Sequence, residues 1–181
     1  MAVLVIAEHD NSVLKTSTFN TITAATNLSD DIHLLIIGKD IETLSNNAKS
    51  IYPIKKVLKC DNSKLENFIP ELSAPIISNI ANGYTHILAP ASTFGKNLLP
   101  RVSALLDITQ ISDVIEIVTE NTFVRPIYAG NAISHVETDQ SINLLTIRPT
   151  SFDKCEETGG NASIDDVDFI DNEVKTIFIG R

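Results

Sequence analysis

The chain has 181 residues, of which 43% are hydrophobic and 20% are charged, and this composition excludes a wholly disordered protein. Its length corresponds to roughly one domain of ~150 residues with a short tail. The net charge of -9 opposes binding to the phosphates of nucleic acid or to an anionic lipid surface. We therefore expect no nucleic-acid partner.

The cysteines and the hydropathy pattern indicate a soluble protein in a reducing compartment. Cys60 and Cys155 lie far apart and outside any disulfide-framework or zinc spacing. The apolar residues 2–7 follow Met1 directly, without the features of a signal or transit peptide. No apolar run approaches the ~20 residues that cross a bilayer, so we expect a cytoplasmic protein without membrane insertion.

The first half alternates short apolar runs with helical patterns. Four runs are apolar enough to be strands buried on both faces, which is typical of a parallel sheet. These runs are residues 3–7, 33–37, 56–60 and 85–89. The segments 16–28 and 41–50 between them predict helical crossovers.

Two further helices are predicted from their proline and glycine positions. Ser73 predicts an N-cap with Pro75 just inside the helix, and Gly83 predicts its end. Apolar residues at helical spacing between residues 94 and 106 predict the next helix. Pro100 interrupts this pattern, so we expect a break or a late start there.

The second half changes to closely spaced apolar runs that predict an antiparallel meander. The runs are residues 114–118, 122–128, 132–136 and 142–147. The last 31 residues carry eight acids against three basic residues, which indicates a solvated face or, alternatively, a docking segment. Within them Gly159-Gly160 predicts a loop, and residues 174–179 predict a last strand.

Together these elements predict an α/β fold with three layers and a mainly parallel sheet, followed by an antiparallel β-meander. We assign residues 1–150 to this domain, with the meander at 113–148. Residues 151–181 are expected to form an acidic tail whose final strand belongs to the same domain.

The polar loop at residues 8–12 follows the first strand, at the end of a parallel sheet where ligands bind. It contains an acid, an imidazole and a hydroxyl, which are groups used in proton transfer and nucleophilic chemistry. Because no second cluster is tied to it by spacing, an ordinary polar loop is the competing interpretation. We identify no catalytic group and no metal site from the sequence.

The loop at residues 90–97 follows the fourth strand and precedes a helix. Ser92, Thr93, Gly95 and Lys96 are candidates for an anion site, because backbone N–H groups, hydroxyls and a lysine hold phosphates at such positions. A structural turn or a partner contact is the alternative. The loop is not a Walker A motif, and the chain has no GxGxxG fingerprint.

Histidines and arginines in the predicted strands have simpler interpretations. His33, His86 and His135 lack metal-ligand spacing and are expected to be packed or edge residues. Arg125 and Arg148 each precede a proline near a strand end. Each is expected either to form an ion pair across an interface or to solvate its strand.

Several motifs, in this order and at this spacing, give the chain a specific resemblance to one family. They are VIAEH at 5–9, NTITAA at 20–25, FGKNLLPRV at 94–102, ISD at 111–113, FVRPIYAGNA at 123–132 and RPTSF at 148–152. The set resembles the N-terminal domain of the alpha subunit of electron-transfer flavoprotein. The resemblance covers almost the whole chain.

The resemblance implies a Rossmann-like scaffold domain of a heterodimeric electron carrier, not an enzyme. Such carriers pass electrons from acyl-CoA-type dehydrogenases, in fatty acid β-oxidation, towards the quinone pool. In the family, FAD is held chiefly by the alpha subunit's C-terminal domain and AMP by the beta subunit. The family's FAD domain lies beyond the region matched here, so no flavin-binding residue carries over. We expect the 181 residues to be the first half of a two-domain subunit that binds no cofactor alone.

The resemblance also implies the partner and the compartment. The partner is the electron-transfer flavoprotein beta subunit, with interface candidates Arg101, Arg125, Tyr128 and Asn131. The compartment is the bacterial cytoplasm, or the mitochondrial matrix for a processed eukaryotic protein. The alternatives are a free-standing nucleotide-binding module that uses residues 92–96, or a non-functional fragment.

Overall fold

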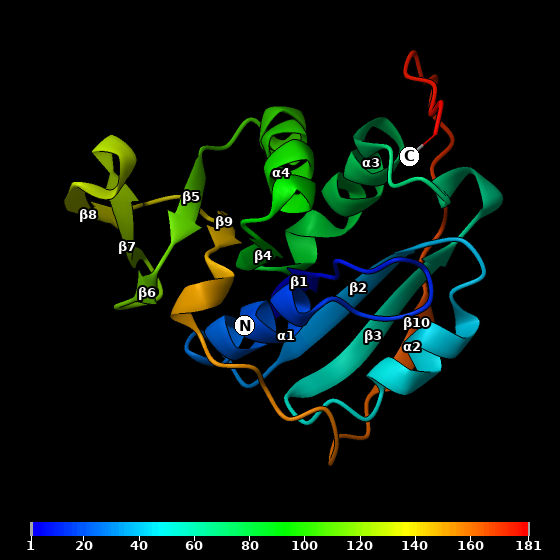
Figure 1. Ribbon diagram of the computed structural model, residues 1–181, viewed down its shortest axis with the longest axis horizontal. Coiled ribbons are helices and arrows are strands. Elements are labelled where there is room, and N and C mark those ends of the chain that lie inside the picture. Colours follow the sequence, from blue (N-terminus) through cyan, green and yellow to red (C-terminus); the bar gives the residue numbers. More distant parts are fainter. Residues whose placement is uncertain (1, 181) are drawn as a thin grey trace.

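A seven-stranded parallel sheet forms the centre of the molecule, in the computed structural model that describes residues 2–180 (Figure 1). Its strands are β1 (Val3–Ile6), β2 (Ile32–Gly38), β3 (Ile54–Asp61), β4 (His86–Pro90), β5 (Gln110–Val114), β9 (Asn143–Ile147) and β10 (Ser163–Asp166). The order is β10-β3-β2-β1-β4-β9-β5, and every pairing is parallel. The predicted α/β fold with a mainly parallel sheet is confirmed.

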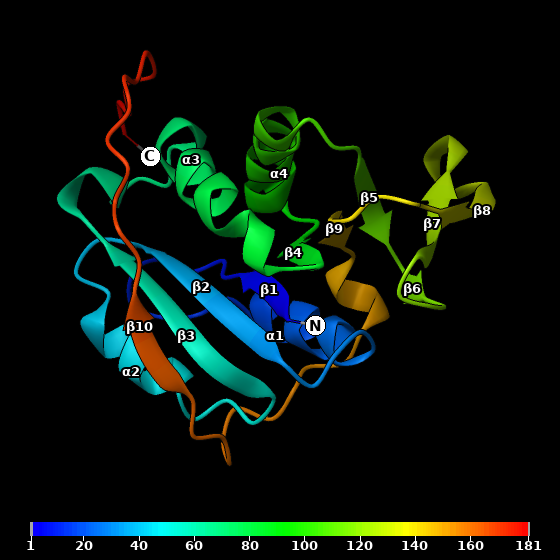
Figure 2. The ribbon, with the colours of Figure 1, turned by 180° about the vertical axis from the view of Figure 1, so that it is seen from behind.

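Helices cover both faces of this sheet and complete three layers (Figures 1 and 2). They are α1 (Thr16–Thr26), α2 (Glu42–Ala48), α3 (Pro70–Ile80) and α4 (Thr93–Leu106). In β1, Val3 and Val5 pack with α1 and α2, whereas Leu4 and Ile6 pack with α3 and α4. Because successive strand residues point to opposite faces, a strand covered on both sides must be apolar throughout.

Helix α3 begins earlier than the sequence predicts. Its first residue is Pro70, and Pro75 lies inside it, so the prediction of Ser73 as N-cap is wrong. A proline at the first position costs nothing, because that N–H has no helical acceptor anyway. The predicted end is close, since α3 passes into a short 3-10 turn, η2 (Ala81–Gly83).

Helix α4 runs through Pro100 without the predicted break or late start. Pro100 removes one backbone donor, which costs ~3 kcal/mol in a helix interior. Buried Leu98, Leu99 and Val102 flank it on both sides and pack against the sheet. Burying each such side chain contributes ~2 kcal/mol, which offsets the lost hydrogen bond.

The antiparallel meander has three strands instead of four. It consists of β6 (Glu116–Ile117), β7 (Thr122–Ile127) and β8 (Ala132–Glu137), which we call the projecting sheet. The fourth predicted run is β9, which lies parallel between β4 and β5. All five β9 residues are buried, so its side chains need cover on both faces, which only the central sheet offers.

The tail adds an edge strand, but not where the sequence predicts it. Strand β10 pairs with β3, whereas residues 174–180 form no strand. Three ion pairs fix the tail, namely Lys56–Asp165 at 2.7 Å, Lys59–Asp166 at 3.1 Å and Lys64–Asp171 at 2.6 Å. Three tail acids therefore pair with lysines of this chain while their side chains stay at least half exposed.

Candidate functional site

The carboxyl ends of β1 and β4 form a crevice at one edge of the parallel sheet. The strand order reverses direction between these two strands, and ligands of open parallel sheets bind at such a switch point. A cavity of about 460 Å³ lies here, between the loop after β1, the loop before α3 and the first turns of α4. The crevice is therefore the first place to test for a ligand.

Acidic groups dominate the charge of this crevice. Glu8 and Asp10 line it together with one cation, Lys15. The backbone N–H groups of Val13 and Ser12 donate to Asp10 Oδ1 and hold the pKa of this carboxyl below its usual value. Asp10 therefore stays ionised, and the crevice favours hydroxyl or amine groups over phosphates.

His9 is a packed, neutral residue at the back of the crevice. Its Nδ1 accepts a hydrogen bond from the Asn11 N–H at 3.0 Å, and its ring meets Phe68 edge-on at 5.0 Å. Burial lowers the pKa of His9 to about 4, against smaller upward effects of the Ile37 carbonyl and Asp10. Because Nδ1 already accepts a backbone hydrogen bond and burial keeps the ring neutral, the geometry of His9 favours the interpretation of residues 8–12 as a polar loop.

Phe68 is a crevice residue that the sequence analysis missed. It has a φ of 54°, which is unusual for a side chain of this size, and its ring also packs edge-on against Phe94 at 6.4 Å. The aromatic pair closes one wall of the crevice. No sequence signal identifies Phe68, because its conformation depends on contacts made by two distant segments.

The four anion-site candidates do not converge on one point. Thr93 lines the crevice, whereas Gly95, in the first turn of α4, packs against the end of β4, where a Cβ would lie 1.9 Å from the Pro90 carbonyl oxygen. Lys96 is exposed and does not line the crevice; it contributes to lowering the pKa of Asp113 in β5. Ser92 is the N-cap of α4, but its side chain makes no capping bond. Gly95 is therefore explained by packing.

The crevice does not fit a flavin pyrophosphate or an AMP phosphate. A phosphate at the start of α4 would face Glu8 and Asp10 across the same cavity, with only Lys15 to compensate. The other polar side chains of the cavity, those of His9, Asn67, Thr93 and Asn97, are uncharged. Within residues 2–180, then, the strand-end site presents the wrong charge for either cofactor.

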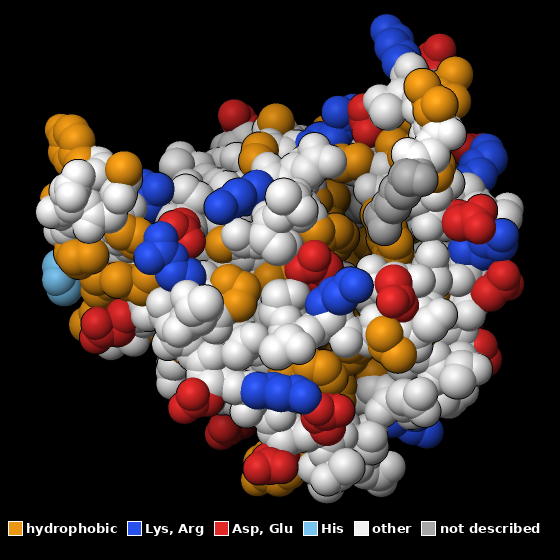
Figure 3. All heavy atoms as spheres, viewed as in Figure 1, with side chains coloured by type: hydrophobic (Ala, Val, Ile, Leu, Met, Phe, Trp, Pro, Cys, Tyr) orange, Lys and Arg blue, Asp and Glu red, His pale blue; other side chains and the backbone are white. Residues whose placement is uncertain are grey.

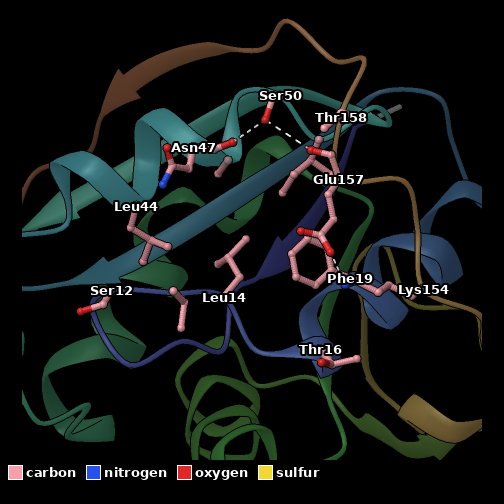
Figure 4. A pocket seen from close by; sticks show the side chains of 13 residues that line it. Ser12, Leu14, Thr16, Phe19, Leu44, Asn47, Ser50, Lys154, Glu157 and Thr158 are labelled. Carbon is pink, nitrogen blue, oxygen red and sulfur yellow. Dashed lines mark hydrogen bonds and ion pairs between the residues drawn. The ribbon is translucent and has the colours of Figure 1, made fainter.

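A second cavity, of about 430 Å³, lies between α1 and α2 (Figure 4). Leu14, Phe19 and Leu44 point into it. Lys154 pairs with Glu157 along one wall and places its Nζ 4.8 Å from the centre of the Phe19 ring. The segment after β9 thus closes this groove and ties the tail to the helical face.

The projecting sheet and the turns that adjoin it expose several large apolar side chains. Tyr128 is 79% exposed, Ile133 55% and Val118 48%. Figure 3 shows hydrophobic side chains over this region, at the left of the view. Tyr128 and Ala129 at its tip have positive φ angles of 50° and 54°, and such strain clusters at functional sites. Exposed apolar surface with a strained tip is typical of a protein contact.

Three of the four predicted interface residues lie on this projecting sheet. Tyr128 and Asn131 are exposed at its tip, whereas Arg125 is half-buried and donates to the Ser112 carbonyl at 2.7 Å and to Ser112 Oγ at 2.9 Å. Arg125 therefore joins the projecting sheet to β5. Arg101 lies elsewhere, on α4, with its nearest carboxylate, Glu71, at 3.9 Å.

Arg148 forms an internal ion pair rather than one across an interface. It donates through two nitrogens to the Asp113 carboxylate and holds the pKa of Asp113 below its usual value. Asp113 has a φ of 62°, and its N–H donates to Thr146 Oγ1 at 2.8 Å. This pair locks the irregular end of β5 to β9.

Comparison with known proteins identifies the family. The model of the electron transfer flavoprotein domain matches residues 3–172. The chain belongs to the electron transfer flavoprotein family. It is 43% identical to the electron transfer flavoprotein subunit alpha of Pseudomonas aeruginosa, over all of this chain and 59% of that protein. It is also 41% identical to the mitochondrial alpha subunit of Dictyostelium discoideum, over 89% of this chain and 48% of that protein.

The chain spans about half the length of these alpha-subunit relatives. The mitochondrial alpha subunit of Arabidopsis thaliana is 38% identical over the whole chain, which covers 54% of that relative. The relatives thus include bacterial and mitochondrial proteins of the electron transfer flavoprotein family. Within residues 2–180, no helix is both long and apolar enough to cross a bilayer.

Proposed function

We propose that residues 1–181 form the scaffold domain of an electron transfer flavoprotein alpha subunit and dock onto a beta subunit through the projecting sheet. The family match supports the subunit, and the exposed apolar tip at Tyr128 supports the docking surface. Tyrosine is enriched at the centres of protein interfaces. In this function the domain positions the partner and performs no chemistry itself.

The electron carrier is proposed to hold its FAD outside this region and its AMP on the beta subunit. The acidic crevice supports this division, because Glu8 and Asp10 disfavour both phosphates. The complete heterodimer would carry electrons from acyl-CoA-type dehydrogenases towards the quinone pool. When bound, the flavin supplies the redox chemistry.

Binding to the cognate beta subunit tests the docking surface. Calorimetry should show complex formation with the unchanged chain and loss of affinity by more than about tenfold for Tyr128→Glu, since the charge would be desolvated at the contact. Tyr52→Glu is the matched control, because Tyr52 is 66% exposed on the turn before β3, at the opposite end of the sheet. Equal binding by both variants would remove the projecting sheet from the interface.

The cofactor proposal has a separate test. The purified chain should be colourless after incubation with FAD and desalting, and calorimetry with AMP should show no heat of binding. A stoichiometric flavin absorbance band would refute the placement of FAD outside this chain. Micromolar AMP binding that disappears in Lys96→Ala would instead favour the free-standing nucleotide-binding module.

A further inference from the structure

Two carboxylate oxygens in the crevice at the ends of β1 and β4 lack a hydrogen-bond donor. Asp10 Oδ1 accepts from two backbone N–H groups of its own loop, but Oδ2 makes only a long contact of 4.0 Å with Lys15 Nζ. In Glu8, Oε2 accepts from the Ser17 hydroxyl at 2.7 Å. Within residues 2–180, no group donates to Asp10 Oδ2 or to Glu8 Oε1. Both side chains line the cavity, so both can accept from a ligand.

A buried donor in the same crevice also lacks a partner. His9 is only 6% exposed and lines the cavity. Its Nδ1 accepts from the Asn11 N–H, so the hydrogen of the neutral ring lies on Nε2. In the described part of the chain Nε2 makes no hydrogen bond, since even the Ile37 carbonyl, which raises the pKa of His9, does not accept one. A buried donor without an acceptor is costly, and a ligand oxygen would remove that cost.

The crevice also has an apolar wall of the kind found in small-molecule sites. Phe68, Pro70, Phe94 and Leu98 line it, and the rings of Phe68 and Phe94 meet edge-on at 6.4 Å. Small-molecule sites have volumes of about 300–1,000 Å³ and combine apolar walls with a few polar groups. The cavity of about 460 Å³ lies within this range. Its size and walls therefore suit a small molecule with one apolar part and one polar part.

The open atoms decide the chemistry of the polar part. Carboxylate oxygens only accept hydrogen bonds, so the ligand must donate to them. An ammonium group donates up to three hydrogen bonds and carries the opposite charge, whereas a phosphate or carboxylate would be repelled. The Lys15 side chain is 51% exposed and does not fill this position. The Nε2–H of His9 needs an acceptor instead, and a hydroxyl group next to the amine supplies one.

We propose that this crevice binds a small organic amine that also carries a hydroxyl group. The ammonium bonds to Glu8 and Asp10, the hydroxyl oxygen accepts from His9, and the apolar part packs on Phe68 and Phe94. This site goes beyond the proposed scaffold function, because it gives the domain a ligand of its own that is neither a flavin nor a nucleotide.

A pair of matched compounds tests the charge of the ligand. The full chain is titrated with 2-amino-1-phenylethanol and, separately, with 1-phenyl-1-propanol, in which a methyl group replaces the amine. Backbone amide NMR should show the amine binding at least about tenfold more tightly, with shifts at residues 8–10 and 67–68. Equal affinities, or no shifts at these residues, would overturn the proposal.

A variant and a third compound test the two kinds of polar contact. Glu8→Gln keeps the size of the side chain and should weaken binding of 2-amino-1-phenylethanol about tenfold. Glu137→Gln is the matched control, because it removes the same charge from an exposed position of β8. Equal weakening by both variants would overturn the site. The third compound, 2-phenylethylamine, lacks the hydroxyl and should bind severalfold more weakly than the amino alcohol. Equal binding of these two amines would overturn the contact with His9.

Discussion

The central parallel sheet and the projecting sheet differ in how far the rest of this chain covers their strands. In the central sheet, β1, β4 and β9 are buried on both faces, and other segments of this chain supply the cover. In the projecting sheet, β8 alternates between half-buried and exposed residues, and its tip exposes Tyr128. The first region covers its own backbone and apolar groups, whereas within residues 2–180 the second leaves some of both exposed.

The difference separates residues that hold the fold from residues that are free to make contacts. Phe123 of β7 is fully buried in the core and anchors the projecting sheet. At the same end of that sheet, His86 Nε2 lies 2.7 Å from the Glu120 carbonyl oxygen, within the turn before β7. The sheet is thus fixed at its base and open along β8, which suits a rigid platform for docking.

The largest effect should come from removing the buried side chain of Phe123. Phe123→Ala should lower the free energy of unfolding by about 4 kcal/mol, because it leaves a large cavity between the projecting sheet and the core. Urea denaturation measures the loss. Ile133→Ala, at an exposed position of the same sheet, should change stability by less than about 0.5 kcal/mol. Similar losses in both variants would contradict the division between anchor and contact residues.

The next largest effect concerns pH and the central sheet. Burial lowers the pKa of His9 from 6.5 to about 4, so between these values the unfolded chain binds a proton that the folded chain excludes. The stability is therefore complete above pH 6.5 and falls by about 3 kcal/mol as the pH drops to 4. His9→Gln should remove this part of the slope in urea titrations at several pH values. The same slope in both proteins would show that His9 is not buried as described.

A smaller effect is expected at the tip of the projecting sheet. Tyr128→Ala should change the free energy of unfolding by less than about 0.5 kcal/mol, because the side chain is exposed. Its affinity for the beta subunit should fall about 30-fold, the cost of removing a central interface aromatic. Thermal denaturation and calorimetry together separate the two effects. If the variant lost more free energy of unfolding than free energy of binding, Tyr128 would be a residue that stabilises the fold and not a contact residue.

The smallest effect should appear at the tail. Lys59 pairs with Glu42 of α2 and Asp166 of β10, and these partners hold its pKa above the usual value. Lys59→Met should speed amide exchange of β10 severalfold and leave β8 unchanged, because surface ion pairs stabilise weakly. Lys55→Met, on the same strand, is the control. Unchanged exchange in β10 would show that strand pairing alone fixes the tail.

Much of the central sheet could be predicted from local pattern. Strands β1, β2, β3 and β4 were predicted from continuous apolar runs, and α1 and α2 were predicted from the segments between these runs. The continuation of α4 through Pro100 could not be predicted. The sequence shows that proline lacks a backbone donor, but it does not show that Leu98, Leu99 and Val102 are buried against the sheet. Nor could the position of β9 be predicted, since a run that follows two short turns also fits a fourth meander strand.

The sites were less predictable than the fold. The polar residues at the ends of β1 and β4 could be located, because parallel strands place their carboxyl ends together. The separation of Thr93, Gly95 and Lys96 could not be predicted. Helix α4 begins at Thr93, so these three positions face different directions around the helix. The open edge of β8 is hidden in the sequence, because its alternating pattern is the same whether or not a strand lies beside it.

The sequence by itself determined the family, the alternation of strands and helices, and the negative charge, because motif order, hydrophobic period and composition are local properties of the chain. Only the tertiary structure decided which strand joins which sheet, where the acidic tail docks and which edge stays open. Those outcomes depend on contacts between distant segments, such as Phe123 with the core and Asp166 with Lys59. Burial and pairing across such distances have no counterpart in a local pattern.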